Sequence, residues 1–487
     1  MTRAVALLVV AFALFASPAA ANVPLTRISS DPFTNTQSQH ATEVEPDTFA
    51  SGSTVVSAQQ VGRFFDGGAT DIGFSRSNDG GSTWTAGFLP GLTATSGIGG
   101  SSGATYERVS DPSVAFDARH GVWLVSSIPL KFNTLNVPTV FVSRSTDGGA
   151  TWAPPVSIPQ PPTSKVDLDK NWTVCDNTAS SPFYGHCYTE FDNFAQGDLE
   201  YMSTSTDGGR TWSTPVATAG NDKGLGGQPL VQSNGTVIVP FESLKGTIGS
   251  FVSTDGGATW SHEFAVSKVN AHGNAGGLRT SPLPSAEIDR AGNAYVAWQD
   301  CRFEPKCAAN DIVFSRSSDG VNWSPVARVP IDAVGSGVDH FIPGLAVDPA
   351  TSGAGANLAL TYYFYPNTAC TPSTCKLTVG YVSSPDAGAH WSARTQLAGP
   401  MSLSDIAATS QGRMVGDYIS TSFNGAGTAA TVFAVGLPHT GKFDEGMWAP
   451  STPLHVASGA QATRAASTAG AASGQGVGEA QHAVRDD

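Results

Sequence analysis

The sequence predicts an all-β fold, a β-propeller built from four-stranded antiparallel blades. Three observations predict it: an octet that occurs six times, short strand signals on both sides of each copy, and almost no helical periodicity in 487 residues that include 54 Gly and 31 Pro. Repeats at a spacing of about 50 to 70 residues are typical of propellers and solenoids. Because each blade buries its faces against its neighbours, a single domain can grow to this length by adding copies.

The octet follows the pattern Ser-x-Asp-x-Gly-x-Thr-Trp, as in "STDGGATW". Four copies are clean, while "SSDGVNW" is one residue short and "SPDAGAHW" has His390 in place of Thr. A side chain that bonds nearby backbone N–H groups, followed by a Gly that adopts positive φ, is the chemistry of a tight turn. We therefore expect each octet at a hairpin tip, with a structural role for its aspartate: Asp79, Asp147, Asp207, Asp255, Asp319 and Asp386.

Further strand signals complete each unit, for instance "SDPSVAFD" and "GVWLVSSIP" before the second octet. Inner-strand signals begin near residues 45, 110, 170, 227, 284, 342 and 415, which favours seven blades. Six blades with a divergent tail is the alternative. The last unit has no octet, and we expect "FDEGMWAP" and the N-terminal "VPLTRISS" to complete it by strand exchange.

The two ends of the chain differ from the repeats. Residues 1–21 carry Arg3, an apolar run and three consecutive alanines, which predicts a secretory signal peptide cleaved after Ala21. The apolar run is too short to span a bilayer, so we expect a secreted protein with no membrane span. Residues 22–456 form the single propeller domain in this interpretation, and residues 457–487, rich in Ala, Gly and Ser, are predicted to be disordered.

The six cysteines form three pairs that are close in sequence. Because an exported chain folds in an oxidising compartment, we expect three local disulfides. They are Cys175 with Cys187, Cys301 with Cys307, and Cys370 with Cys375. Zinc binding is the alternative, but the sequence has neither a second Cys-x-x-Cys nor a His pair at ligand spacing.

The net charge of −14 argues against a nucleic-acid partner, since such binding rests on clustered Lys and Arg. It also gives no help in attracting an anionic glycan, although a local Arg cluster can override the net field. A closed ring leaves few free strand edges, so a monomer is expected.

The octet is identified as the Asp box, or BNR repeat, and its six copies make the chain resemble the sialidase superfamily of β-propellers. The resemblance implies an extracellular glycan or glycoconjugate as partner, and Asp boxes that lie at outer hairpins away from the active site. It also implies a Tyr nucleophile paired with a Glu, an Asp acid/base and three Arg side chains that bind the substrate carboxylate.

This chain departs from the family pattern at several positions. The first inner strand, "ATEVEPDTFASG", has no Arg, and the only loose echo of the family motif is at Arg27. Gln228 stands near the expected Glu, and Phe241 near an expected Arg. The residues that could still assemble a catalytic site are Asp47, Glu242, Arg279, Arg302, Arg413 and Tyr418.

The same residues also have structural interpretations. Arg302 follows "AWQD" at a strand end, where an ion pair between blades is expected, and Asp111 and Asp417 would cap inner strands.

Two local clusters add candidate binding residues. Asp167, Asp169 and Asp176 offer oxygen ligands that calcium prefers, with a plain turn as the alternative; no other cofactor is expected. The loop "SSPFYGHCYTEFDN" offers aromatic side chains that could stack on sugars, with core packing as the alternative. These side chains are Phe183, Tyr184, His186 and Tyr188.

Two functional hypotheses follow. The first is an exported glycoside hydrolase of sialidase-like fold, acting on a sialoside or another glycan. The second is a non-catalytic propeller that binds glycan, cell-surface polymer or protein. The missing Arg motif and Gln228 favour the second on mechanism, while the family resemblance favours the first by association.

Overall fold

The computed structural model describes residues 23–96, 106–457, 463–464 and 466–467. Within them the fold is all-β, as predicted, and helix is confined to five 3-10 turns. The turns are η1 (Phe194–Gln196), η2 (Ala275–Gly277), η3 (Pro305–Cys307), η4 (Gly353–Gly355) and η5 (Leu403–Asp405). None of the described helices is long and apolar enough to cross a membrane. The signal peptide predicted for residues 1–21 lies outside the described residues.

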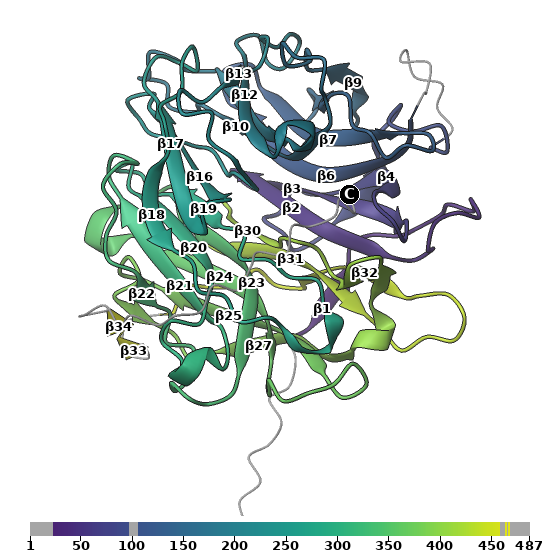
Figure 1. The fold of residues 1–487 in the computed structure, drawn as a ribbon, viewed down its shortest axis with the longest axis vertical. Coiled ribbons are helices and arrows are strands. Elements are labelled where there is room, and N and C mark those ends of the chain that lie inside the picture. Colours follow the sequence, from purple (N-terminus) through teal and green to yellow (C-terminus); the bar gives the residue numbers. More distant parts are fainter. Residues whose placement is uncertain (1–22, 97–105, 458–462, 465, 468–487) are drawn as a thin grey trace, which may run out of the picture.

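The strands pair as antiparallel four-stranded units that follow one another along the chain (Figure 1). The first unit contains β2 (Glu43–Ser51), β3 (Thr54–Arg63), β4 (Ala69–Ser77) and β5 (Thr85–Phe88). The second contains β6 (Tyr106–Asp117), β7 (Val122–Lys131), β8 (Phe141–Ser145) and β9 (Ala153–Ser157). One residue pair, Ala69 with Val109, joins these two units into an eight-stranded sheet.

The next three units repeat the pattern. The third contains β10 (Leu168–Cys175), β11 (Cys187–Asn193), β12 (Leu199–Ser205) and β13 (Val216–Ala217). The fourth contains β14 (Gly224–Leu225), β15 (Leu230–Val231), β16 (Val237–Ser243), β17 (Thr247–Ser253) and β18 (Phe264–Lys268). The fifth contains β19 (Ser285–Ile288), β20 (Ala294–Asp300), β21 (Asp311–Ser317) and β22 (Ala327–Arg328).

The last two units include the strand exchange that the sequence predicts. The sixth contains β23 (Asp339–Val347), β24 (Leu358–Tyr365), β25 (Lys376–Ser384) and β27 (Thr395–Ser402). The seventh contains β30 (Ser420–Phe423), β31 (Ala429–Gly436), β32 (Glu445–Pro450) and β1 (Leu25–Arg27). β1 pairs with β32, so the first and last described parts of the domain share one sheet.

Five more short strands of the described residues lie outside these units. β28 (Ala407–Thr409) and β29 (Gly412–Met414) form a hairpin between the sixth and seventh units. β33 (Thr463–Arg464) pairs with β26 (His390–Trp391), and β34 (Ala466–Ser467) pairs with β22. These pairs are the described part of the segment from residue 457 onward, and disorder over the rest of it stays a prediction.

The hydrophobic core lies between consecutive units. One cluster joins Phe74 of the first unit to Phe141 and Trp152 of the second, and another joins Phe314 of the fifth to Trp391 of the sixth. The Trp of an octet thus packs against the preceding unit, which explains why the repeat ends in a large aromatic residue.

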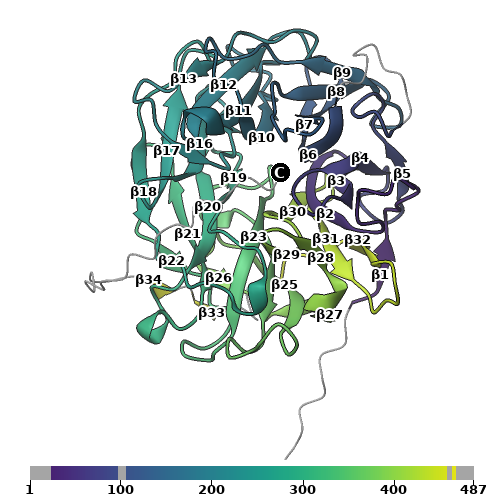
Figure 2. The same cartoon turned by 45° about the vertical axis from the view of Figure 1, so that its right-hand side comes forward.

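Antiparallel pairing gives the molecule two distinct faces. The first strands of all units begin at the face where the second strands end; we call it the mouth face. The octets lie between third and fourth strands and therefore lie on the opposite face, the box face. In Figure 2 the first strands β2, β6, β10, β19, β23 and β30 surround the middle of the molecule, and each contacts a neighbouring first strand.

The first strands share a local distortion near the mouth face. Four of them, β2, β6, β10 and β23, have a β-bulge at which one non-glycine residue takes positive φ: Glu45 (56°), Asp111 (49°), Lys170 (49°) and Ile342 (50°). Such residues are uncommon in strands and often lie at functional sites, where the surrounding structure supports the strain. Three of these four side chains are ionisable, which places charge at the mouth.

Candidate functional site

The aspartates of the octets are bonded within their own turns. Oδ1 of Asp79 accepts hydrogen bonds from Ser77 Oγ at 2.7 Å and from the Thr83 amide at 2.8 Å, and Oδ2 accepts from Thr83 Oγ1 at 2.6 Å. The Thr83 hydroxyl bond lowers the pKa of Asp79 to about 2. The same bonding recurs at Asp147, Asp207 and Asp255, which supports the structural role predicted for these residues.

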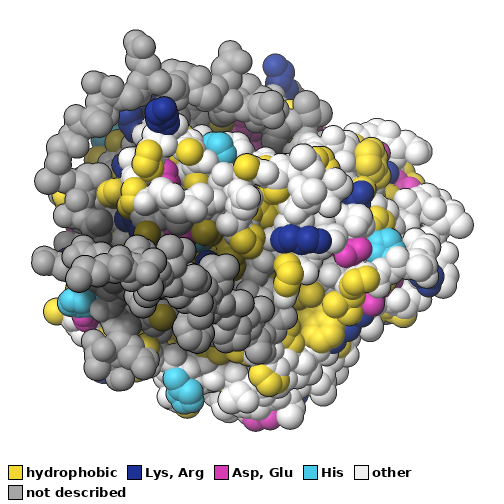
Figure 3. All heavy atoms as spheres, turned by 90° about the horizontal axis from the view of Figure 1, so that it is seen from below, with side chains coloured by type: hydrophobic (Ala, Val, Ile, Leu, Met, Phe, Trp, Pro, Cys, Tyr) yellow, Lys and Arg dark blue, Asp and Glu magenta, His cyan; other side chains and the backbone are white. Residues whose placement is uncertain are grey.

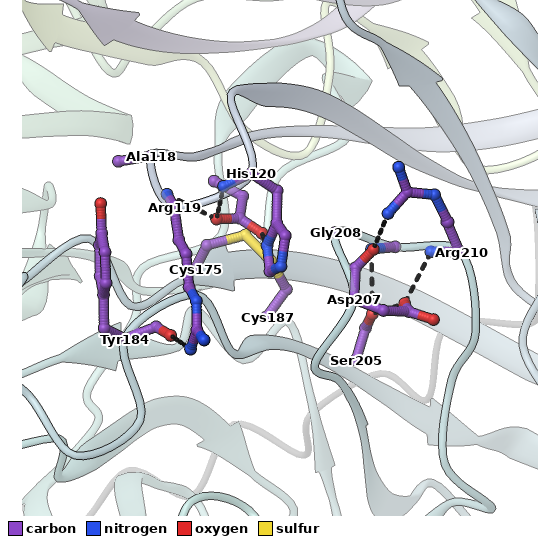
Figure 4. Close-up of polar contacts among 12 residues, drawn as sticks. Ala118, Arg119, His120, Cys175, Tyr184, Cys187, Ser205, Asp207, Gly208 and Arg210 are labelled. Carbon is purple, nitrogen blue, oxygen red and sulfur yellow. Dashed lines mark hydrogen bonds and ion pairs between the residues drawn. A yellow bond between two sulfur atoms is a disulfide. The ribbon is translucent and has the colours of Figure 1, made fainter.

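The aromatic loop between β10 and β11 lies on this box face. Figure 4 shows it beside the third octet, where Asp207 accepts from Ser205 and from the Arg210 amide, and where Arg119 donates to the Tyr184 carbonyl at 2.8 Å. The Cys175–Cys187 disulfide closes the loop. All three predicted disulfides are present, and the described residues include no free cysteine.

The four sugar-stacking candidates do not form one open surface. Tyr188 is fully buried and contacts Trp260 with ring centroids 6.2 Å apart. Phe183 and His186 are half-buried, and the His186 ring nitrogen lies 3.3 Å from the Gly256 carbonyl of the next unit. Tyr184 is half-buried as well. Core packing, the alternative interpretation, describes Tyr188, while sugar stacking by the three half-buried side chains stays a prediction.

On the mouth face, ion pairs between buried side chains connect three first strands. Arg279 binds Asp417 through two bonds, Nε to Oδ1 at 2.8 Å and Nη2 to Oδ2 at 2.6 Å. Lys170 Nζ lies 2.7 Å from Asp417 Oδ2 and 3.5 Å from Asp111 Oδ2. Burial opposes ionisation, but Arg279 and Lys170 hold the pKa of Asp417 below its usual range. Asp417 is therefore an ion-pair partner rather than a simple strand cap.

Glu45 extends this ion-pair network. Its Oε1 accepts a hydrogen bond from the Asp417 amide at 3.1 Å, and its Oε2 accepts from Gln60, which also donates to Ser110 Oγ at 2.9 Å. Burial raises the pKa of Glu45 to about 8, and the charge of Asp111 raises it further in the same direction. The mouth thus holds a carboxyl group that retains its proton at neutral pH.

Tyr418 lies within the same region but its hydroxyl is already bonded. It donates to the Pro112 carbonyl at 3.1 Å, and its ring makes an edge contact with Trp172 at 5.2 Å. Burial, followed by the charge of Glu45, raises the pKa of Tyr418 well above its ordinary value. A phenol in this state is poorly activated as a nucleophile.

Glu242 is the half-buried acid of the mouth. Burial raises its pKa to about 7, and the charge of Asp417 contributes to the rise. Arg413 lies beside Arg279, whose amide donates to the Arg413 carbonyl at 2.7 Å, but the Arg413 guanidinium donates to the Ile406 carbonyl. Of the six catalytic candidates, the structure brings Glu242, Arg279, Arg413 and Tyr418 into one region.

Arg302 and Asp47 lie elsewhere. Arg302 forms its ion pair with Asp300 of its own unit, not between units, and contacts the preceding unit through hydrogen bonds to Ser267 Oγ and the Lys268 carbonyl. Asp47 accepts hydrogen bonds from the backbone amide of Val114 at 2.6 Å and from Ser420 Oγ at 3.0 Å.

Asp47 is one of several first-strand side chains that bond the next unit. Ser113 accepts from the Thr173 amide at 3.1 Å, Gln228 from the Ala286 amide at 2.7 Å, and Ser285 from the Leu345 amide at 2.9 Å. The family resemblance places Gln228 near the position of the expected Glu. Here its side-chain oxygen accepts a hydrogen bond from the Ala286 amide of the next unit.

The three aspartates of the calcium hypothesis are not brought together. Asp167 and Asp169 lie at the mouth-face end of β10, whereas Asp176 follows the other end of this eight-residue strand. Asp167 Oδ1 accepts from the Val137 amide at 2.8 Å, and Asp176 Oδ2 accepts from Ser181 Oγ.

Two cavities lie along the first strands. The one at the mouth measures only about 20 Å³ and is lined by Asp111, Lys170, Gln228 and Asp417, among others. The other, nearer the box face, measures about 510 Å³ and includes Asp47, Trp172, Glu287 and Arg290 in its wall. The mouth cavity therefore has room for about one water molecule but not for a sugar ring.

Sequence reasoning missed Lys170 as a member of the mouth. A signal was present, because the first strands repeat an X-Pro pair at the bulge: Pro46, Pro112, Pro229, Pro284 and Pro343. When the units are aligned on this pair, Glu45, Asp111 and Gln228 occupy equivalent positions, each directly before the Pro. Lys170 and Asp417 occupy the corresponding positions in the two units that have no Pro there.

Comparisons with known proteins agree with the Asp-box repeats described above. The family model of the BNR/Asp-box repeat matches residues 251–262. A curated protein named sialidase from Bacteroides fragilis is 29% identical over 168 residues, which cover 29% of this chain and 28% of that protein. The chain therefore matches well under half of the length of this relative.

Solved structures of similar fold include two sialidases. The NanB sialidase of Streptococcus pneumoniae is 14% identical, with a TM-score of 0.44 over 89% of this chain and 71% of NanB. Trypanosoma rangeli sialidase, solved in complex with sialic acid, is 12% identical, with a TM-score of 0.46 over 74% of this chain and 59% of that chain. The Asp-box repeats and the curated sialidase relative identify the fold of this chain as that of the sialidase superfamily.

Proposed function

We propose that this chain is a secreted, non-catalytic propeller that binds a neutral extracellular glycan through its mouth face. The proposal includes seven blades, closed by the pairing of β1 with β32 and supported by the contacts between successive first strands. It also includes residues 22–456 as one monomeric domain, a signal peptide over residues 1–21 and a disordered tail. N-terminal sequencing of the exported protein tests the cleavage after Ala21.

The observation that carries the proposal is a set of exposed apolar side chains at equivalent turns. Phe65, Phe132 and Phe194 are 54%, 45% and 41% exposed, and each lies in the turn between the second and third strands of its unit. Leu244 occupies the same turn of the fourth unit and is 38% exposed. Four consecutive units therefore present an apolar side chain on the mouth face, and aromatic rings in such positions suit the apolar faces of sugars.

The ion pairs of the mouth argue against an anionic ligand. Arg279, which could bind a carboxylate, is held by two bonds to Asp417 instead. Figure 3 shows one side of the molecule, on which the described Lys and Arg side chains lie scattered among hydrophobic and uncharged ones. A glycan that binds through stacking and hydrogen bonds fits these features better than a sialoside does.

A glycan array tests this proposal directly. The purified protein is applied to neutral β-glucan, xylan and mannan oligosaccharides beside sialyllactose, and the affinity for any neutral hit is then measured. We expect the double variant Phe65→Ala, Phe132→Ala to weaken binding at least tenfold. Val216→Ala is the control, because Val216 is 38% exposed on the outermost strand β13. Binding of sialyllactose alone, or of no glycan, contradicts the proposal.

A second candidate function rests on Glu242. A half-buried carboxylic acid with a pKa of about 7 suits general-acid chemistry at a glycosidic oxygen. A fluorogenic glycoside panel decides between the two functions. Turnover that disappears in Glu242→Gln but persists in Glu287→Gln establishes hydrolysis, since Glu287 also has a raised pKa but lies in the other cavity.

A further inference from the structure

A cluster of ionisable side chains lies between the fifth and sixth units, away from the mouth. Asp311 is the first residue of β21, Asp332 lies in the loop between β22 and β23, and His340 is the second residue of β23. One ligand atom from each of the three lies within 4.8 Å of the other two. Asp311 is 2% exposed, His340 is fully buried and the Asp332 side chain is 17% exposed.

The orientation of His340 places an unprotonated ring nitrogen opposite a carboxylate. Its Nδ1 lies 3.3 Å from the Asn310 carbonyl, which can only accept, so Nδ1 carries the proton and Nε2 presents a lone pair. Nε2 faces Asp332 Oδ2 at 3.7 Å and is without a hydrogen bond among the described residues. Two acceptors that face each other in a buried site repel, and a cation or a bridging water that lies between them removes this repulsion.

The charge balance of the cluster supports the same conclusion. The Arg328 guanidinium contacts Asp311 at 2.7 Å, Asp332 at 3.0 Å and Glu304 at 3.7 Å. The three carboxylates outnumber the guanidinium that they contact, so these four side chains together carry excess negative charge. Oδ2 of Asp311 is also buried and without a hydrogen bond among the described residues.

We propose that Asp311, Asp332 and His340 bind a divalent transition-metal cation, with Zn²⁺ as the ion whose ligand preferences fit best. Two carboxylates and a neutral imidazole suit Zn²⁺, and the Nδ1 bond to a backbone carbonyl is the usual outer contact of a histidine ligand. Ligand atoms in a tetrahedral zinc site lie about 3.4 Å apart, close to the 3.7 Å between His340 and Asp332. The metal would hold the 329–338 loop against β21 and β23.

The test uses the purified full chain after treatment with a chelator and dialysis. We expect calorimetry with Zn²⁺ to give one site per chain, and an anomalous diffraction peak to lie between the three side chains. Asp332→Asn and His340→Gln should each weaken Zn²⁺ binding at least tenfold. Asp332→Asn decides the question if His340→Gln fails to fold, because Asp332 lies in a loop and is partly exposed.

His390→Gln is the matched control. His390 Nδ1 lies 2.6 Å from Asp386 Oδ2, but the His390 side chain is 45% exposed and this His–Asp pair has no third ligand. We expect His390→Gln to bind Zn²⁺ as the unmodified protein does. Absence of stoichiometric binding, unchanged binding in Asp332→Asn, or an anomalous peak elsewhere overturns the assignment.

Discussion

The octet turns and the first strands of this protein use carboxylates in opposite ways. In the octets, Asp79 and Asp319 are exposed, and hydrogen bonds from their own turns lower their pKa values to about 2, against the effect of partial burial. In the first strands, Glu45 and Glu287 have pKa values raised to about 8, with burial as the largest cause. The octet aspartates therefore stabilise turns. The acids of the first strands differ from unit to unit, and burial disfavours their charged forms.

This difference teaches where specific chemistry can arise in a repeat protein. An octet aspartate has its hydrogen-bonding capacity used within eight residues, so its side chain needs no partner from a neighbouring unit. A first-strand acid has partners from other units, as Asp417 has in Arg279 and Lys170. Chemistry specific to this chain is therefore expected at the first strands and the mouth-face turns, and stability is expected to depend on the octets and the first strands alike. The changes below test this division.

The largest effect is expected at Asp417. Asp417→Ala removes the carboxylate that Arg279 and Lys170 both contact, and removal of one partner from a buried ion pair typically costs about 3–5 kcal/mol. Denaturant unfolding measures this loss. The control is Asp444→Ala, because the Arg27–Asp444 pair is 31% and 41% exposed and should contribute about 0–1 kcal/mol. Similar losses of unfolding free energy in both variants would show that the buried ion pairs of the mouth stabilise the fold no more than an exposed pair does.

Two glutamines of the fourth unit allow a smaller comparison between the faces. Gln228 accepts from the Ala286 amide near the mouth, whereas Gln232 donates to the Gly292 and Ser318 carbonyls near the box face. We expect Gln228→Leu to cost about 1–3 kcal/mol in unfolding free energy, because a buried N–H group loses its acceptor. Gln232→Leu should cost less, since carbonyls tolerate a lost donor better than amides tolerate a lost acceptor. The reverse order in thermal and denaturant unfolding would refute this reasoning.

The sequence predicts the fold better than it predicts the site. The octets, the strand signals and the final strand exchange are local patterns, and each corresponds to a described element or pairing. The site depends on which side chains meet across units. Arg302 forms an ion pair two residues away, with Asp300, whereas Arg279 binds Asp417, which is 138 residues away in the sequence. The second partner follows from the packing of distant units, which the sequence alone does not give.

The pH dependence of stability separates the two kinds of carboxylate. The pKa of Glu287 is about 8 in the folded state against 4.5 for the ordinary group, so the folded state binds more protons between these values. Stability from this group therefore falls as pH rises from about 4.5 to 8, and the full penalty is present above pH 8. Glu287→Gln should match the unmodified protein at pH 5 and exceed it by about 1–2 kcal/mol at pH 9.

Asp79→Asn is the matched change at an octet. The pKa of Asp79 is depressed to about 2, so its contribution is present above the ordinary value near 3.8 and is lost only as pH falls toward 2. The cost of Asp79→Asn should therefore be equal at pH 5 and pH 9, as measured by thermal unfolding. A pH-dependent cost at Asp79, or a constant effect at Glu287, contradicts the assigned shifts.

The smallest effect is expected from an octet aspartate removed outright. Asp255 accepts from Ser253 Oγ at 2.8 Å, from the Thr259 amide at 3.0 Å and from Thr259 Oγ1 at 2.6 Å. Since water can replace these partners at an exposed turn, Asp255→Ala should cost only about 1 kcal/mol of unfolding free energy. It should leave glycan binding and any glycosidase activity unchanged, because the turn lies on the face opposite the mouth. A variant that folds normally but loses its ligand would move the functional surface to the box face, where the half-buried Tyr184 and Phe183 lie.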